Sequence, residues 1–164
     1  MNARKGLFFR RDDDGPEKGK SLDVRRIGGK DKFTVAVASV AVAGYWSHWT
    51  GSYTTGCTGR ENGCVACADF LPERWHGFLH VCDVKGSRGI FLDLTKDGKD
   101  NLTAALPEEQ PLRGSVLLVW REHSSDKRPL CFEWMRNVAE GVILPEPADA
   151  ALLVARIWGH RKVH

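Results

Sequence analysis

Residues 57–67 read CTGRENGCVAC, and they separate two segments that are rich in strand-forming residues. Cys64 and Cys67 have the Cys-x-x-Cys spacing that turns two thiolates toward one cation, and six residues with two glycines allow Cys57 to return to the same point. Without a cation, three clustered thiolates would repel one another. Because Zn²⁺ binds such donor sets, the stretch predicts a zinc-binding knuckle over residues 45–67.

A tetrahedral ion needs a fourth donor, and His48 is the residue we expect to supply it. His48 lies within the same segment, residues 45–67, whereas the alternatives Cys82, His76 and His80 come after this segment. Four protein ligands leave no open position, so the predicted zinc is structural and not catalytic. An iron–sulfur cluster is disfavoured because no fourth cysteine stands at a suitable spacing.

Outward from the knuckle, five segments have the composition of β-strands, and one segment between the third and the fourth favours a short helix. The expected strands are residues 33–44, 74–85, 88–95, 113–122 and 129–136, and the helix falls within 96–110. This order is the connectivity of the OB-fold, a small Greek-key barrel. We therefore expect a mainly β, five-stranded OB-like barrel, with the zinc knuckle inserted between strands one and two. Another small barrel or sandwich is the competing architecture.

Three parts follow along the chain. Residues 1–32 hold ten Lys or Arg and six Asp or Glu with almost no apolar periodicity, which indicates a flexible charged tail. Residues 33–140 are expected to form the barrel. Residues 141–164 are expected to form a C-terminal amphipathic helix and a basic tip. Tail and tip are either solvated or arms that touch a polyanion or an acidic partner.

The overall charge of +3 excludes a polycation, so any nucleic-acid role must come from local patches. The longest apolar run, residues 35–45, is about half a bilayer span, and no stretch resembles a signal peptide. We therefore expect a cytoplasmic protein without membrane association. In a reducing cytosol, clustered thiols favour metal over disulfides.

The second and third expected strands carry a candidate nucleic-acid-binding face. His76, Phe78 and His80 alternate on one side of the second strand, and Phe91 stands on the matching side of the third. Aromatic rings that stack bases, together with cations for phosphates, are typical of single-strand binding. The candidate residues are Trp46, Trp49, Arg74, His76, Phe78, Lys85, Arg88 and Phe91, and Tyr45 and Tyr53 extend the set. The alternative is that the tryptophans fill the core and the terminal helix covers the outer face.

The pattern His-Trp…Cys…Cys-x-x-Cys followed by RWHGFL (residues 74–79) resembles small zinc-containing OB-fold proteins of phages and mobile elements. The resemblance covers about residues 33–136. It implies single-stranded DNA binding in replication, recombination or genome defence. Among specific positions, it carries over only the four expected ligands, His48, Cys57, Cys64 and Cys67.

Motifs of an enzyme are absent from the sequence, so we expect a non-catalytic protein. It lacks a phosphate-cradling glycine loop, a Gly-x-Ser-x-Gly elbow and a His-Glu-x-x-His helix. Asp93, Asp97 and Asp100 could form a magnesium cluster, but the last two are better explained as turn residues. An accessory subunit or inhibitor that docks on a larger nucleoprotein enzyme is the alternative function. RNA in place of DNA is a weaker option.

Overall fold

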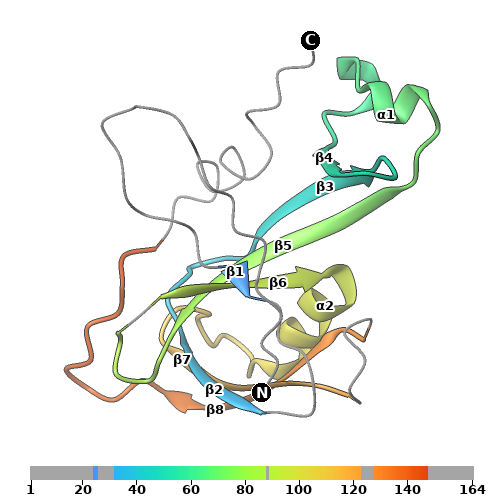
Figure 1. Cartoon of the computed structure of the whole chain (residues 1–164). Helices are drawn as coiled ribbons and strands as arrows, with labels where there is room; N and C mark the ends of the chain where they lie inside the picture. The colour runs from blue at the N-terminus through green and yellow to red at the C-terminus, as the bar shows by residue number, and fades with distance from the viewer. Residues whose placement is uncertain (1–23, 26–31, 88, 123–127, 148–164) are drawn as a thin grey trace, which may run out of the picture.

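The computed structural model describes residues 24–25, 32–87, 89–122 and 128–147, and it is mainly β, as expected (Figure 1). The elements in chain order are β1 Val24–Arg25, β2 Phe33–Val37, β3 Ala43–Trp49, β4 Thr54–Gly56, the 3₁₀ turn η1 Arg60–Asn62, α1 Val65–Ala68, β5 Glu73–Cys82, β6 Ile90–Thr95, α2 Lys96–Ala105, β7 Ser115–Arg121 and β8 Leu130–Asn137. Strands β5 to β8 and helix α2 lie where the sequence pattern predicts them. In the described part of the chain, no helix is long and apolar enough to cross a membrane.

All eight strands belong to one sheet, with the order β1-β6-β5-β2-β7-β8. Strand β3 pairs with β5 beside β2, and β4 pairs with β3. Every pairing is antiparallel except that of β1 with β6. Within the described ranges no ladder joins β6 to β8, so the sheet is open. The sequence predicts a five-stranded OB-like barrel, and closure of the sheet into a barrel is not observed among the described residues.

The expected first strand, residues 33–44, is divided into β2 and β3. Val37 pairs with Val81 and Ala43 pairs with Phe78, so residues 38–42 oppose only two residues of β5. At this break the backbone N–H groups of Ala38 and Ser39 both donate to the His80 carbonyl, at 2.9 and 3.2 Å. The Ser39 hydroxyl accepts from the His80 N–H at 2.7 Å. A side chain thus replaces part of the ladder, and the chain bends there.

The core lies where one face of the open sheet meets α2. Alternate residues of the strands point into it, and in β5 and β6 these residues lie on the side opposite the candidate nucleic-acid-binding face. Thr95 caps α2 by accepting from the Gly98 N–H at 3.2 Å, and Leu102 packs into the core. The buried cluster is Val35, Val37, Leu79, Val81, Leu92, Leu94, Leu102, Leu117, Val119, Leu130 and Phe132.

Strands β3 and β5 continue beyond this core as a two-stranded ribbon, and β4, η1 and α1 lie at its far end (Figure 1). We call residues 45–73 the distal lobe. At the base of the ribbon, Gly44 and Gly77 face each other, and a Cβ on either would collide with the indole of Trp75. The two glycines let this ring lie flat across the ribbon between core and lobe.

Part of the expected tail is a strand, because Val24–Arg25 pairs with β6. The rest of residues 1–31 and the expected helix at 148–158 lie outside the described residues. After β8, the chain returns across the outer face of the sheet, where Val138 and Leu144 pack against Ala36, Cys82 and Val116.

Candidate metal centre

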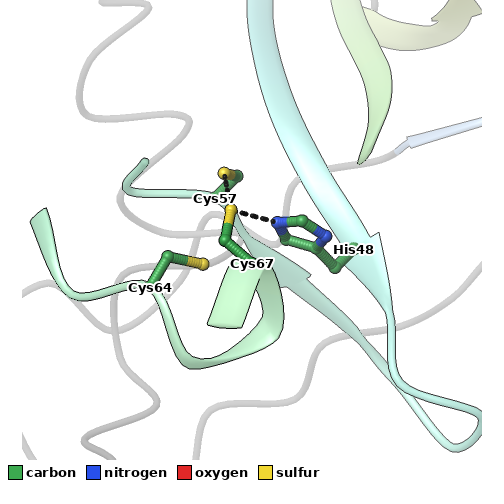
Figure 2. Close-up of side chains that lie close together, drawn as sticks. All are labelled: His48, Cys57, Cys64 and Cys67. Atoms are coloured by element: carbon green, nitrogen blue, oxygen red, sulfur yellow. Dashed lines mark hydrogen bonds between the residues drawn. The ribbon is translucent and has the colours of Figure 1, made fainter. Parts of the chain in front are cut away.

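The four residues expected to bind metal lie together in the distal lobe. His48 comes from β3, Cys57 directly follows β4, Cys64 precedes α1 and Cys67 lies within α1. Their ligand atoms, one imidazole nitrogen and three sulfurs, all lie within 4.8 Å of one another. Figure 2 shows the three thiols gathered on one side of the imidazole. The cluster could therefore hold a metal ion.

His48 is held in the orientation that a ligand needs. Its side chain is fully buried, and its Nδ1 lies 2.9 Å from the Leu71 carbonyl oxygen. Because a carbonyl only accepts, Nδ1 carries the hydrogen of this bond, and the lone pair of the neutral ring is on Nε2. That nitrogen lies 3.4 Å from Cys67 Sγ. A second-shell carbonyl that fixes the ring in this way is typical of metal-binding histidines.

The sulfur spacing suits a tetrahedral cation. Cys57 Sγ lies 3.4 Å from Cys67 Sγ, and no disulfide joins any of the cysteines. Ligands 2.0–2.3 Å from a tetrahedral Zn²⁺ are separated by about 3.5–3.8 Å, close to the two 3.4 Å distances of the cluster. The backbone N–H of Gly59 donates to Cys57 Sγ at 3.4 Å and orients this thiol. Three soft sulfurs and one imidazole form a donor set that fits such an ion.

The thiols differ in acidity. Burial alone would raise the pKa of Cys64, but backbone groups of Cys67 and Thr58 and the neighbouring thiols donate to its sulfur and lower the pKa to about 6. Burial raises the pKa of Cys57. Burial and the adjacent thiols raise the pKa of Cys67 to about 12. A cation bound by all three sulfurs would displace the protons that these thiols still carry.

Glu73 is a further acidic group at the cluster that the sequence analysis missed. Its Oε1 lies 3.6 Å from Cys57 Sγ and 3.5 Å from Cys67 Sγ. The carboxylate arrives there because Glu73 pairs with His48 across β3 and β5. Only the strand register reveals this proximity, and the spacing of the cysteines contains no signal for it.

The alternative fourth ligands lie elsewhere. Cys82 is buried at the far end of β5 and donates to the Ala36 carbonyl at 3.6 Å. His76 Nδ1 contacts the Asp93 carboxylate at 3.3 Å. The His80 ring stacks on Phe91, with 4.7 Å between centroids. None of the three belongs to the cluster.

The candidate nucleic-acid-binding residues do not form one face. Trp46, Trp49 and Arg74 are exposed on the ribbon near the metal cluster, and Trp46 and Trp49 point to its opposite faces. Lys85 is exposed in the turn beyond the opposite end of β5, a strand about 30 Å long. Arg88 lies outside the described residues.

The two expected stacking platforms, Phe78 and Phe91, are both buried, at 6% and 7% exposure. The His80 ring covers Phe91, and His76, beside Phe78, is itself half-buried. Burial and the nearby Arg113 charge lower the pKa of His80, and Arg113 Nη1 donates to the Pro145 carbonyl at 2.8 Å. The segment after β8 therefore lies against this part of the sheet, where the alternative interpretation expects the terminal helix as the cover.

Comparison of the chain with protein-family models, curated proteins and solved structures gives no match. The class of site thus rests on geometry alone: a Cys₃His cluster, able to hold a metal ion, at the end of a β-ribbon.

Proposed function

We propose that the protein is a non-catalytic single-stranded nucleic-acid-binding module, with DNA as the ligand, whose distal lobe is held together by one structural Zn²⁺. His48, Cys57, Cys64 and Cys67 would hold the ion. The composition of the lobe supports a structural metal. Its described buried side chains are only Ser47, His48, Cys64 and Ala66, and they contain too little apolar volume for a hydrophobic core. A structural zinc supplies folding free energy that such a loop lacks.

The order of the strands supports an OB-like relationship. Strands β2, β5, β6, β7 and β8 follow one another with α2 between the third and the fourth. The OB-fold is a partly open five-stranded barrel with this connectivity, and its loop between strands one and two contributes to the ligand site. The distal lobe occupies that connection. The resemblance to zinc-containing single-stranded DNA-binding proteins points to the same class.

Exposed aromatic side chains on the β3–β4 hairpin carry the proposal. Trp46, Trp49 and Tyr53 are 46%, 45% and 43% exposed and fall within eight residues of sequence. Arg74, also exposed, stands on the neighbouring strand opposite Ser47. Exposed rings beside a cation are the elements of sequence-tolerant single-strand binding, since every base offers a flat π-face.

The test is a titration of intrinsic tryptophan fluorescence with oligothymidylate, oligouridylate and duplex DNA at two salt concentrations. We expect quenching by oligothymidylate that weakens as salt rises, because phosphate contacts release counterions. Trp49→Ala should raise the Kd about 5- to 100-fold, the loss of one stacked base.

Phe33→Ala provides the matched control. Phe33 is 42% exposed but lies on β2, away from the lobe, so its removal should leave the Kd unchanged. Absence of binding at low salt, or equal effects of Trp49→Ala and Phe33→Ala, would contradict the proposal.

A protein-interaction module is the second candidate, and the charge of the lobe favours it. Residues 45–74 contain two arginines against three carboxylates, which gives little general attraction for phosphates. In this case, the protein would dock on a larger nucleoprotein enzyme. Co-purification with one stoichiometric protein, at an affinity insensitive to added oligonucleotide, would select this function.

A further inference from the structure

Helix α1 ends in a turn that places Phe70 in an unusual backbone conformation. The N–H of Leu71 donates to the Ala66 carbonyl at 2.9 Å, and the N–H of Phe70 donates to the Cys67 carbonyl at 3.2 Å. These two bonds form a Schellman motif, in which the residue at the Phe70 position adopts a left-handed conformation. Phe70 has φ 57° accordingly.

Local structure does not favour phenylalanine at this position. Glycine is the usual residue there, and a side chain with a Cβ costs about 1–2 kcal/mol in the left-handed region. Burial does not compensate, because the Phe70 side chain is 81% exposed. A strained, exposed aromatic residue therefore indicates a role outside the fold of the lobe.

The backbone of Phe70 lies next to the candidate metal cluster. Phe70 lies between the proposed ligand Cys67 and Leu71, whose carbonyl holds His48. The Arg60 guanidinium lies 4.7 Å from the centroid of the Phe70 ring, in cation–π contact with it. With a cation on one face and most of its surface in water, the ring offers its other face to a flat ligand.

We infer that Phe70 and Arg60 form a stacking site for a nucleobase, at the same end of the ribbon as Trp49. This inference rests on the proposed single-strand binding and adds a site at the tip of the lobe to it. The base stacks on the open face of Phe70, and Arg60 contributes positive charge for the adjacent phosphate. An aromatic ring paired with an arginine suits a polyanion with planar bases better than a purely apolar protein pocket.

Phe70→Gly tests the inference, because glycine removes the ring and favours the left-handed backbone. We expect this variant to keep its metal content and to melt no lower than the wild type. Its Kd for oligothymidylate should rise about 5- to 100-fold. Phe70→Trp should retain the wild-type affinity, whereas Phe70→Leu, apolar but not aromatic, should lose it as Phe70→Gly does.

An oligonucleotide with abasic sites throughout separates stacking from other contacts. On this probe, wild type and Phe70→Gly should bind equally weakly, since no base remains to stack. A difference that persists on the abasic probe, or a Phe70→Leu variant with full affinity, would overturn the stacking site.

Two further outcomes distinguish this site from the function on which it rests. If Phe70→Gly binds oligothymidylate like the wild type while Trp49→Ala weakens binding, the Phe70 site is wrong and the proposed function stands. If the wild type binds no single strand at low salt, the Phe70 stacking site and the proposed function are both wrong. The exposed ring would then be a contact for a protein partner.

Discussion

The sheet core and the distal lobe are parts of one chain with opposite compositions. The core buries eleven apolar side chains from five strands and α2. The lobe buries two polar side chains, one alanine and one cysteine, while it exposes Trp46, Trp49, Tyr53, Val65 and Phe70. The hydrophobic effect can account for the first region and not for the second. A metal ion in the distal lobe would supply the stability that buried apolar side chains supply in the core.

Strand β5 belongs to both regions. Its first residue, Glu73, lies at the cysteine cluster, and its Leu79 and Val81 are fully buried in the core. If the two regions are stabilised by different interactions, a substitution in one should leave the other intact. Four changes, from the largest expected effect to the smallest, test this separation.

Cys64→Ser should have the largest effect, because it removes one of four proposed ligands. We expect the metal content to fall from about one ion per chain to near none, and the lobe to unfold locally. Hydrogen exchange should become fast in residues 45–73 and stay slow at residues 79–81. Cys131→Ser, a cysteine outside the cluster, should change neither quantity. Equal protection of the lobe in both variants would contradict the separation.

Leu117→Ala should damage the other region. Leu117 is fully buried in β7, and the cavity left behind should lower the free energy of unfolding by about 2–5 kcal/mol. Denaturant unfolding measures this loss, and elemental analysis should find the metal content unchanged. A variant that loses its metal along with its stability would show that the core and the lobe are one cooperative unit.

Gly77→Ala tests the joint between the regions. A Cβ there would collide with the indole of Trp75, so we expect a loss of about 1–3 kcal/mol in unfolding experiments. Gly98→Ala is the matched control, because a Cβ in α2 would meet its neighbours only at 3.6 Å or more. In a helix, alanine is favoured over glycine by about 0.5–1 kcal/mol. Equal losses in the two variants would argue against the packing of Trp75 across the ribbon.

Asp83→Ala should have the smallest effect, in the turn from β5 to β6. The Ser87 hydroxyl, and then the N–H groups of Ser87 and Lys85, donate to the Asp83 carboxylate and hold its pKa below its usual value. A carboxyl group whose pKa is lowered by folding stabilises the fold at pH values above its pKa in the unfolded chain, about 3.9 for Asp. This stability is lost as the pH falls through the pKa of the folded state.

Melting temperatures from pH 7 downward measure this contribution. The difference between wild type and Asp83→Ala should be constant above about pH 5 and shrink below about pH 4. Ser87→Ala removes the strongest donor and should reproduce part of the difference. A difference that grows on acidification would have the wrong sign for a stabilised carboxylate.

Local patterns predicted strands β5 to β8 and the cysteine cluster, because both depend on short-range spacing. The alternation of residues 74–81 and 90–95 identifies the inward side of β5 and β6, and the Cys-x-x-Cys pair indicates a shared cation. The break at residues 38–42 was missed, since this apolar stretch has strand composition and the contacts of Ala38 and Ser39 with His80 join segments far apart in the sequence.

Features that depend on distant segments were not predictable in this way. The alternation of residues places Phe78 and Phe91 on the side of the sheet opposite the core. It could not show that this outer side is covered, because the cover comes from the His80 ring and from the chain after β8. Glu73 reaches the cluster only through its register with His48. Phe70 has no periodic signal, because its conformation depends on the end of α1, a helix of only four residues.

In the proposed lobe, one cation bound by three sulfurs and one imidazole holds the chain together. X-ray absorption spectroscopy at the zinc edge, on protein purified without added metal, tests it most directly. We expect about one zinc per chain, with three sulfurs at about 2.3 Å and one nitrogen at about 2.0 Å. A chain that carries no zinc, or a zinc surrounded by oxygen atoms alone, would contradict it.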